Sequence, residues 1–194
     1  MTNPIAQELT ELAARDQRMR AKLLAAGVLH DGYHPQMEAV HRDNAEHLEA
    51  IILAVGWPTE TLVGADAAQA AWLIAQHAIG LPEFQRTCLR HLEEAANRGL
   101  LPLWQPAMLE DRIRMFEGRP QIYGTQLEPD ERGDLRPYLI EDPQRVDQRR
   151  QAVGLEPLAQ GLARTAPAPP PKDRAQYERD YQEWLYRVGW RVRR

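Results

Sequence analysis

Glycine and proline divide the first part of this 194-residue chain into five segments, each with apolar residues at helical spacing. Glycine commonly ends a helix, and proline disfavours helical geometry in the residue before it. The spacing and these stops together predict helices over residues 4–26, 35–55, 65–79, 82–97 and 106–117. The chain should therefore fold mainly as a helical bundle.

The apolar period changes after residue 118. Residues 121–127 have the pattern of an extended strand, 131–134 of a turn and 135–140 of a returning strand. Two strands alone are only marginally stable, so this hairpin should pack on the helices. We therefore predict a mainly α fold with one small β-hairpin near 120–140, followed by a helix over 142–153.

A proline-rich stretch separates the C-terminal part from the rest. The sequence Ala-Pro-Ala-Pro-Pro-Pro is typical of a semi-rigid linker, and an amphipathic helical pattern follows it. We predict a globular domain over residues 1–164, a linker over 165–172 and a basic amphipathic helical tail over 173–194.

The formal net charge of −4 is unevenly distributed, because the tail is basic and the remainder is acidic. An acidic body argues against nucleic acid as its main partner. The tail helix is predicted to dock on the body, with a protein partner or a second copy of the chain as alternatives. We found no apolar run long enough to span a membrane, no signal-peptide pattern and a single cysteine, so we expect a cytoplasmic protein.

Several polar residues fall on predicted apolar helix faces, where an unpaired polar group costs about 1–3 kcal/mol. Asp16 lies within the apolar face of the first helix, with Arg20 one turn later. His77 follows in the most apolar helix, and Arg112 lies between apolar residues with Asp111 beside it. Such residues either pair with one another or line a wet cavity.

The first interpretation is structural: the histidine is a core residue whose ring nitrogens are hydrogen-bonded, and the charged residues form ion pairs that fix helices. The second brings the polar residues together in one pocket. There His77 would be the general base, because the ordinary pKa of histidine lies near neutrality. Asp111 would orient it or act as the acid, and Arg20 and Arg112 would bind an anionic group.

The segment after the last bundle helix would form a wall of the same pocket. On an extended chain, alternate residues point to one face, which here would present an amide, a phenol and a hydroxyl. The predicted ligand-binding residues are Asp16, Arg20, Gln121, Tyr123, Thr125 and Gln126.

Some chemistries find no support in the residues. Serine is absent, which excludes a serine nucleophile, and no glycine loop of the phosphate-binding type occurs. His41 and His47 lie six residues apart, on different sides of a helix, although Asp43 and His47 would share an ion given a third ligand. We predict no metal site, and the sequence leaves any cofactor unknown.

Four short sequence words occur together at characteristic intervals: Gly-Trp-Pro-Thr at 56–59, Gln-His-Ala at 76–78, Asp-Arg at 111–112 and Gln-Ile-Tyr-Gly-Thr-Gln at 121–126. With them the chain resembles a bacterial family known only as a domain of unknown function, over roughly residues 9–162. The resemblance implies a stand-alone bacterial domain and no particular mechanism.

Two functions follow as hypotheses. The first is a small-molecule enzyme or binding protein, with an acid–base or hydrolytic pocket for an anionic substrate. The alternative is a protein-interaction or regulatory module that uses the C-terminal helix, with a purely structural polar network.

Overall fold

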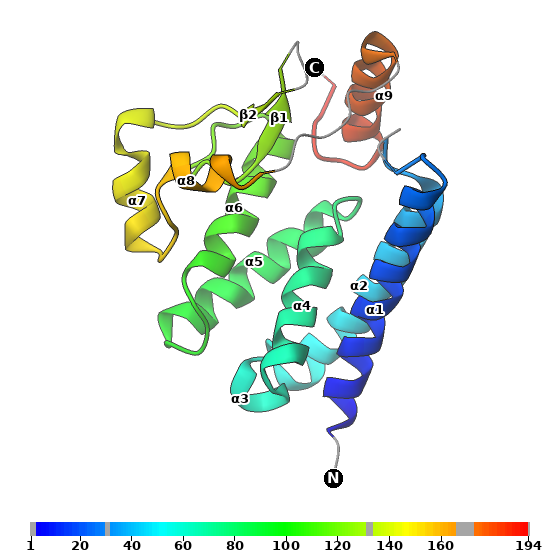
Figure 1. The fold of residues 1–194 in the computed structure, drawn as a ribbon. Coiled ribbons are helices and arrows are strands. Elements are labelled where there is room, and N and C mark those ends of the chain that lie inside the picture. Colours follow the sequence, from blue (N-terminus) through cyan, green and yellow to red (C-terminus); the bar gives the residue numbers. More distant parts are fainter. Residues whose placement is uncertain (1–2, 30–31, 131–133, 166–172, 194) are drawn as a thin grey trace. The chain divides into compact units, whose positions relative to one another are not determined.

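The structure, a computed structural model, describes residues 3–29, 32–130, 134–165 and 173–193. The chain divides into two compact units, Met1–Leu101 and Pro102–Arg194. Each unit has its own helices and is described by itself (Figure 1).

The first unit consists of helices. Helices α1, α2 and α4 pack against one another, and α4 also contacts α3 and α5. Figure 1 shows α1 and α2 lying side by side along most of their length. The helices of this unit are α1 (Pro4–Ala25), α2 (Pro35–Val55), α3 (Glu60–Val63), α4 (Ala65–His77) and α5 (Pro82–Asn97).

Local signals explain where the two long helices begin and end. The Asn3 side chain accepts hydrogen bonds from the first amides of α1, and Pro4 occupies the first helical position, where no amide hydrogen is needed. At α2 the ring of His34 accepts a hydrogen bond from the Gln36 amide. Gly56 ends α2 with a φ of 77°, a conformation that glycine adopts without strain.

The core of the first unit is formed by the helix faces that the apolar pattern predicted. Burying these side chains supplies most of the stability of such a small bundle. Its buried apolar residues include Leu9, Leu12, Leu23, Met37, Leu48, Ile51, Ile52, Ala71, Ile74 and Leu92. Among them lie buried polar groups, and these form the site described below.

The second unit combines helices with a two-stranded antiparallel hairpin. Its elements are α6 (Trp104–Glu117), β1 (Leu127–Pro129), β2 (Leu135–Pro137), η1 (Pro143–Arg145), α7 (Val146–Ala152), α8 (Leu158–Ala163) and α9 (Arg174–Arg187). Gly118 ends α6 in the left-handed conformation, with a φ of 76°.

The hairpin is shorter than predicted and begins later. Leu127 pairs with Pro137, and Pro129 pairs with Leu135. Before β1, residues 121–126 are irregular apart from an isolated bridge between Gln121 and Ile140. The predicted strand over 121–127 is thus wrong for most of its length. The reason is a buried carboxylate that captures the backbone amides of this segment.

The C-terminal tail packs within the second unit. Trp184 and Trp190 lie against Phe116 of α6, with ring centroids 5.6 and 5.1 Å apart, and all three side chains are buried. Arg191 donates a hydrogen bond of 3.1 Å to the carbonyl of Phe116. The aromatic face of α9 is therefore used largely inside the chain.

The predicted fold class is confirmed: the protein is mainly helical, with one hairpin and a C-terminal helix. The linker was predicted over residues 165–172, of which 166–172 lie outside the described residues, as does part of the predicted turn, 131–133. The predicted boundary after residue 164 stays a prediction. In the described part of the chain, no helix has the length and apolar character needed to cross a membrane.

Candidate functional site

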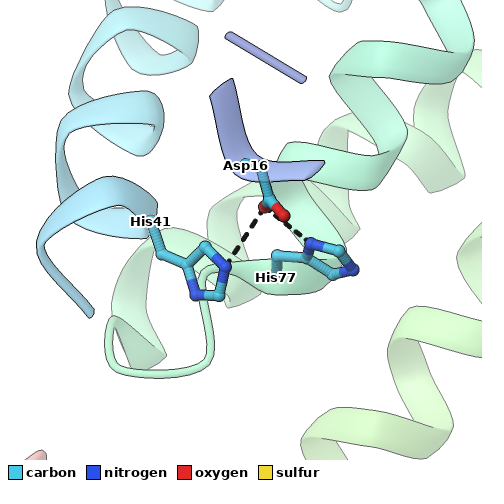
Figure 2. A group of neighbouring side chains, drawn as sticks. All are labelled: Asp16, His41 and His77. Carbon is cyan, nitrogen blue, oxygen red and sulfur yellow. Dashed lines mark hydrogen bonds and ion pairs between the residues drawn. The ribbon is translucent and has the colours of Figure 1, made fainter. Parts of the chain in front are cut away.

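A buried carboxylate lies at the centre of the first unit. Asp16 of α1 is 1% exposed, and its Oδ2 accepts a hydrogen bond of 2.7 Å from Nδ1 of His77. Nε2 of His41 lies 3.1 Å from the same oxygen. Figure 2 shows the two rings approaching the carboxylate from different helices. We call these three side chains the Asp16 centre.

His41 reaches the carboxylate because it lies on the buried face of α2, four residues after Met37 and three before Asn44. Its other ring nitrogen, Nδ1, is 2.8 Å from the hydroxyl of Tyr33, and the two rings stack with centroids 5.7 Å apart. Burial raises the pKa of Tyr33 far above its ordinary value, so this group is a neutral phenol.

His77 is the last residue of α4 and the most open member of the centre. Its side chain is 26% exposed, compared with 10% for His41. The nitrogen that does not contact Asp16 points away from the carboxylate (Figure 2). Asp16 therefore fixes the orientation of this imidazole and leaves its second nitrogen free for a reactant.

The two imidazoles determine the charge state of Asp16. Burial alone raises the pKa of this carboxyl, because a low-dielectric surrounding disfavours its charged form. Interactions with the neighbouring rings of His41 and His77 more than offset burial, and they hold the pKa of Asp16 well below its ordinary value. Asp16 is consequently an anion throughout the neutral range.

A shallow hollow adjoins the centre on the His41 side. Two of its lining residues, Glu38 and Arg42, form an ion pair at 3.5 Å. Gly80 lies close to Tyr33, since a Cβ at this position would lie 3.3 Å from the Tyr33 ring. The hollow is lined by Tyr33, Glu38, His41, Arg42, Ala78, Gly80 and Leu81.

The second unit has a buried carboxylate of its own. Asp111 of α6 is 0% exposed. It accepts hydrogen bonds from the amides of Ile122, Tyr123 and Thr125, of 2.6 to 3.1 Å, and from the Thr125 hydroxyl at 3.1 Å. Burial raises the pKa of Asp111, and these hydrogen bonds oppose that shift.

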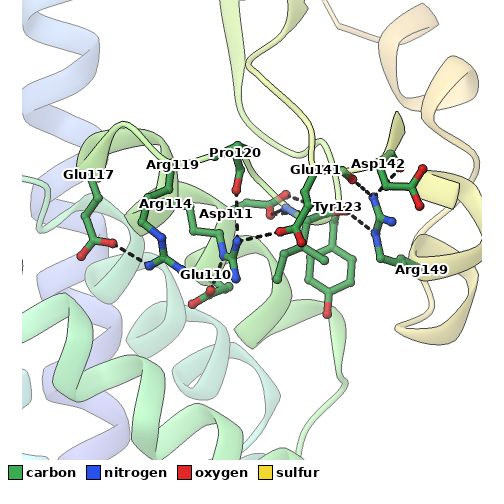
Figure 3. A network of polar contacts seen from close by, with 11 residues as sticks. Glu110, Asp111, Arg114, Glu117, Arg119, Pro120, Tyr123, Glu141, Asp142 and Arg149 are labelled. Carbon is green, nitrogen blue, oxygen red and sulfur yellow. Dashed lines mark hydrogen bonds and ion pairs between the residues drawn. The ribbon is translucent and has the colours of Figure 1, made fainter. Parts of the chain in front are cut away.

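Two arginines hold the carbonyl groups of the same segment. Arg149 donates from Nε to the carbonyl of Ile122 at 2.8 Å, and Arg150 donates to the carbonyl of Tyr123 at 2.7 Å. Figure 3 shows Arg149 and Asp111 on either side of this loop. Side chains thus bind the amides of residues 122, 123 and 125 and the carbonyls of residues 122 and 123, and we call residues 122–125 the clamped loop.

A further arginine stabilises the start of the clamped loop. Arg114 pairs with Glu110 one turn earlier on α6 and with Glu141 at 3.1 Å, and it donates to the carbonyl of Pro120 at 3.2 Å (Figure 3). Interactions with these carboxylates raise the pKa of Arg114 despite its burial. The arrangement fixes the chain where it leaves α6.

The glutamines of the predicted pocket wall form hydrogen bonds within their own segment. Gln121 is 0% exposed, donates to the carbonyls of Gln126 and Tyr138 at 3.0 and 2.8 Å, and accepts from the Gln126 amide at 2.9 Å. The side chain of Gln126 donates to the Thr125 hydroxyl at 3.0 Å. Both residues therefore close the loop on itself.

Arg112 differs from its neighbours. Its Nε is buried and has no hydrogen-bond partner among the described residues. Burial lowers the pKa of this guanidinium to about 10.

A comparison with known families covers most of the chain, since residues 3–165 match the model of the family of unknown function DUF6624. The chain belongs to this family. The DUF6624 region contains both the Asp16 centre and the clamped loop, whereas α9 lies beyond it. No curated protein and no solved structure matches the chain. The predicted resemblance to a domain of unknown function is thereby confirmed.

The predicted site residues of this DUF6624 protein fall into two groups. Asp16, Arg20 and His77 belong to the first unit, and Asp16 pairs with His77 and His41 while Arg20 is exposed. The remaining residues, Asp111, Arg112, Gln121, Tyr123, Thr125 and Gln126, belong to the second unit. A single pocket for all of them stays a prediction.

Two residues at or beside the Asp16 centre, His41 and Tyr33, were not among the predicted site residues. The spacing of His41 from Met37 and Asn44 places it on the buried face of α2. That spacing was the available signal. Tyr33 lies in the loop before α2, where apolar spacing gives no information, so its contact with His41 could not be predicted from the sequence.

Proposed function

We propose that the first unit carries the reaction centre of a small-molecule enzyme, and that this centre removes a proton from water or substrate in a hydrolytic or acid–base reaction. The observation that supports the proposal is the Asp16 centre itself. A buried carboxylate that orients an imidazole is a recurrent way to build a general base.

The chemistry follows from the atoms of the centre. Asp16 accepts the Nδ1 hydrogen of His77 and stabilises the imidazolium that forms when the ring takes up a second proton. The free nitrogen of His77 is then the atom that receives the proton. His41, on the same carboxylate oxygen, places a second imidazole nearby.

An anionic substrate fits the surroundings of the centre. Arg42 lines the hollow next to His41, and its side chain is 57% exposed. Arg20, one turn beyond Asp16 on α1, is exposed as well. Guanidinium groups bind carboxylate or phosphate groups through paired hydrogen bonds, so both residues would hold the substrate near His77.

A panel of p-nitrophenyl phosphate, phosphodiester and carboxylate esters tests the proposal. We expect His77→Gln to lower turnover by about 100-fold or more, the usual contribution of a general base. His47→Gln is the matched control, because His47 pairs with Glu8 at 2.7 Å between the same helices, α1 and α2, but outside the centre. Equal activity of folded His77→Gln and the parent chain contradicts the proposal.

The interaction hypothesis has less support. Trp184 and Trp190, the largest side chains of the tail, pack on Phe116 in the same unit and leave less apolar surface for a partner. Residues Tyr177 and Tyr181 of α9 stack on each other, with centroids 6.4 Å apart. We retain the cytoplasm as the proposed compartment of the enzyme.

A further inference from the structure

We infer that Asp16, His41 and His77 bind one divalent ion of the zinc class. This inference rests on the proposed function, since it names a cofactor for the same centre. One carboxylate oxygen and one nitrogen from each ring lie within 4.8 Å of one another. They come from three helices that pack together, so the donors are held by the core of the unit.

The donor atoms are close to the spacing that a metal ion requires. With bonds of about 2.0–2.1 Å, tetrahedral ligand atoms lie roughly 3.3 Å apart. Here the carboxylate oxygen is 2.7 Å from His77 and 3.1 Å from His41. For these two pairs, an outward movement of a few tenths of an ångström gives the required separation when an ion replaces the bridging proton, and the two ring nitrogens already lie within 4.8 Å of each other.

The unused polar atoms of the centre point to a ligand. Nε2 of His41 is buried and makes no hydrogen bond, although an oxygen of Asp16 is only 3.1 Å away. Its N–H axis is therefore not aimed at that oxygen. Oδ1 of Asp16 is also buried without a hydrogen-bond partner among the described residues. Leaving such atoms unpaired is costly. An ion would satisfy Nε2 of His41 directly, and it would satisfy Oδ1 as well where both oxygens of Asp16 share it.

A supporting interaction fixes one of the ligands. Tyr33 lies 2.8 Å from Nδ1 of His41, the nitrogen that faces away from the carboxylate. Histidines that bind metals usually make such a hydrogen bond with their second nitrogen, which sets the tautomer and the ring orientation. The Tyr33 ring lies so close to Gly80 that a Cβ at position 80 would approach it to 3.3 Å.

The class of ion and its role follow from the ligand set. Two imidazole nitrogens and one carboxylate oxygen suit zinc and its neighbours, whereas magnesium and calcium prefer oxygen ligands throughout. Three protein ligands leave a coordination position, and the partial exposure of His77 gives water access to it. An ion there lowers the pKa of a bound water, and so replaces His77 as the group that activates it.

Titration of the full chain with Zn²⁺, and separately with Co²⁺ or Mg²⁺, tests the inference by calorimetry and, for Co²⁺, by visible absorption. We expect one Zn²⁺ per chain and no comparable binding of Mg²⁺. The affinity for Zn²⁺ should fall by about 100-fold or more in Asp16→Asn and His77→Gln. It should fall by roughly tenfold in Tyr33→Phe, the usual effect of losing an outer hydrogen bond.

His47→Ala is the matched control, because it removes an exposed imidazole between the same two helices. Binding that is absent, or that weakens as much in His47→Ala as in His77→Gln, overturns the inference. If Asp16→Asn does not fold, the Zn²⁺ affinity of His77→Gln tests the inference by itself. This variant should fold, because His77 lies at a helix end and is partly exposed.

The metal site and the proposed function fail in different ways. If the chain binds Zn²⁺ through these residues but turns over no substrate, the metal site is supported and the proposed enzymatic function is wrong. If the chain binds no Zn²⁺ but is active, and His77→Gln abolishes that activity, the metal site is wrong and the role of His77 as general base is supported.

Discussion

Replacing Asp111 by alanine should destabilise the second unit by about 3–5 kcal/mol. The carboxylate accepts hydrogen bonds from three backbone amides and one hydroxyl of the clamped loop. A donor left unpaired in a buried place costs about 1–3 kcal/mol. Four donors at the lower end of that range give the estimate, because residues 122, 123 and 125 are only partly buried and water would satisfy some of them.

Hydrogen exchange of the amides of Ile122, Tyr123 and Thr125, with urea unfolding of the same samples, measures the effect. These amides should lose most of their protection in Asp111→Ala. Glu110→Ala is the control, since the adjacent carboxylate forms an ion pair with Arg114 that contributes about 1 kcal/mol or less. Asp111→Ala within 1 kcal/mol of the parent, with protection intact, would refute the assignment of this carboxylate to the scaffold.

Three further predictions concern single positions. Gly124→Ala should cost about 1–3 kcal/mol in urea unfolding, because Gly124 has a φ of 70° and an added Cβ would lie 2.9 Å from Ile140; a neutral result would contradict the loop geometry. Trp190→Ala should cost about 3–5 kcal/mol by loss of its packing, and a thermal unfolding curve unchanged from the parent would show that the tail does not dock. The low pKa of Asp16 means that its stabilisation is complete above about pH 4 and is lost as the pH falls further. With a metal chelator present, the difference in free energy of unfolding between the parent and Asp16→Asn should therefore shrink as the pH falls from 6 to 2. A constant difference would refute the ion pairing.

The helices were predictable because two independent signals agreed. Apolar spacing indicated the buried face, and glycine or proline marked the ends, as Gly56 and Gly118 do for α2 and α6. The predicted bounds of the main helices fall within two residues of the observed ones. Signals of this kind are local, so a single sequence contains them.

The clamped loop was not predictable from its own residues. Alternating polar side chains from Gln121 to Gln126 indicate a strand when they are considered alone. Asp111, eleven residues before the loop begins, satisfies the amides that a strand would have paired with a neighbour. A buried side chain that competes for backbone groups in this way acts through tertiary structure, which outweighs local preference.

The Asp16 centre was predictable in part. The position of Asp16 and of His77 on apolar faces singled out both residues. Their partners depended on how three helices pack, which spacing does not specify. For that reason the sequence suggested Arg20 as the partner of Asp16, whereas in the structure Asp16 pairs with His41 and His77 and Arg20 is exposed.

Anomalous X-ray diffraction at the zinc edge, from crystals of the full chain grown with Zn²⁺, tests the central claim most directly. We predict one strong peak about 2.0–2.2 Å from Nε2 of His41, Nδ1 of His77 and an oxygen of Asp16. Zinc bound only at surface groups such as His47 and Glu8, with the Asp16 centre still bridged by protons, would contradict the account.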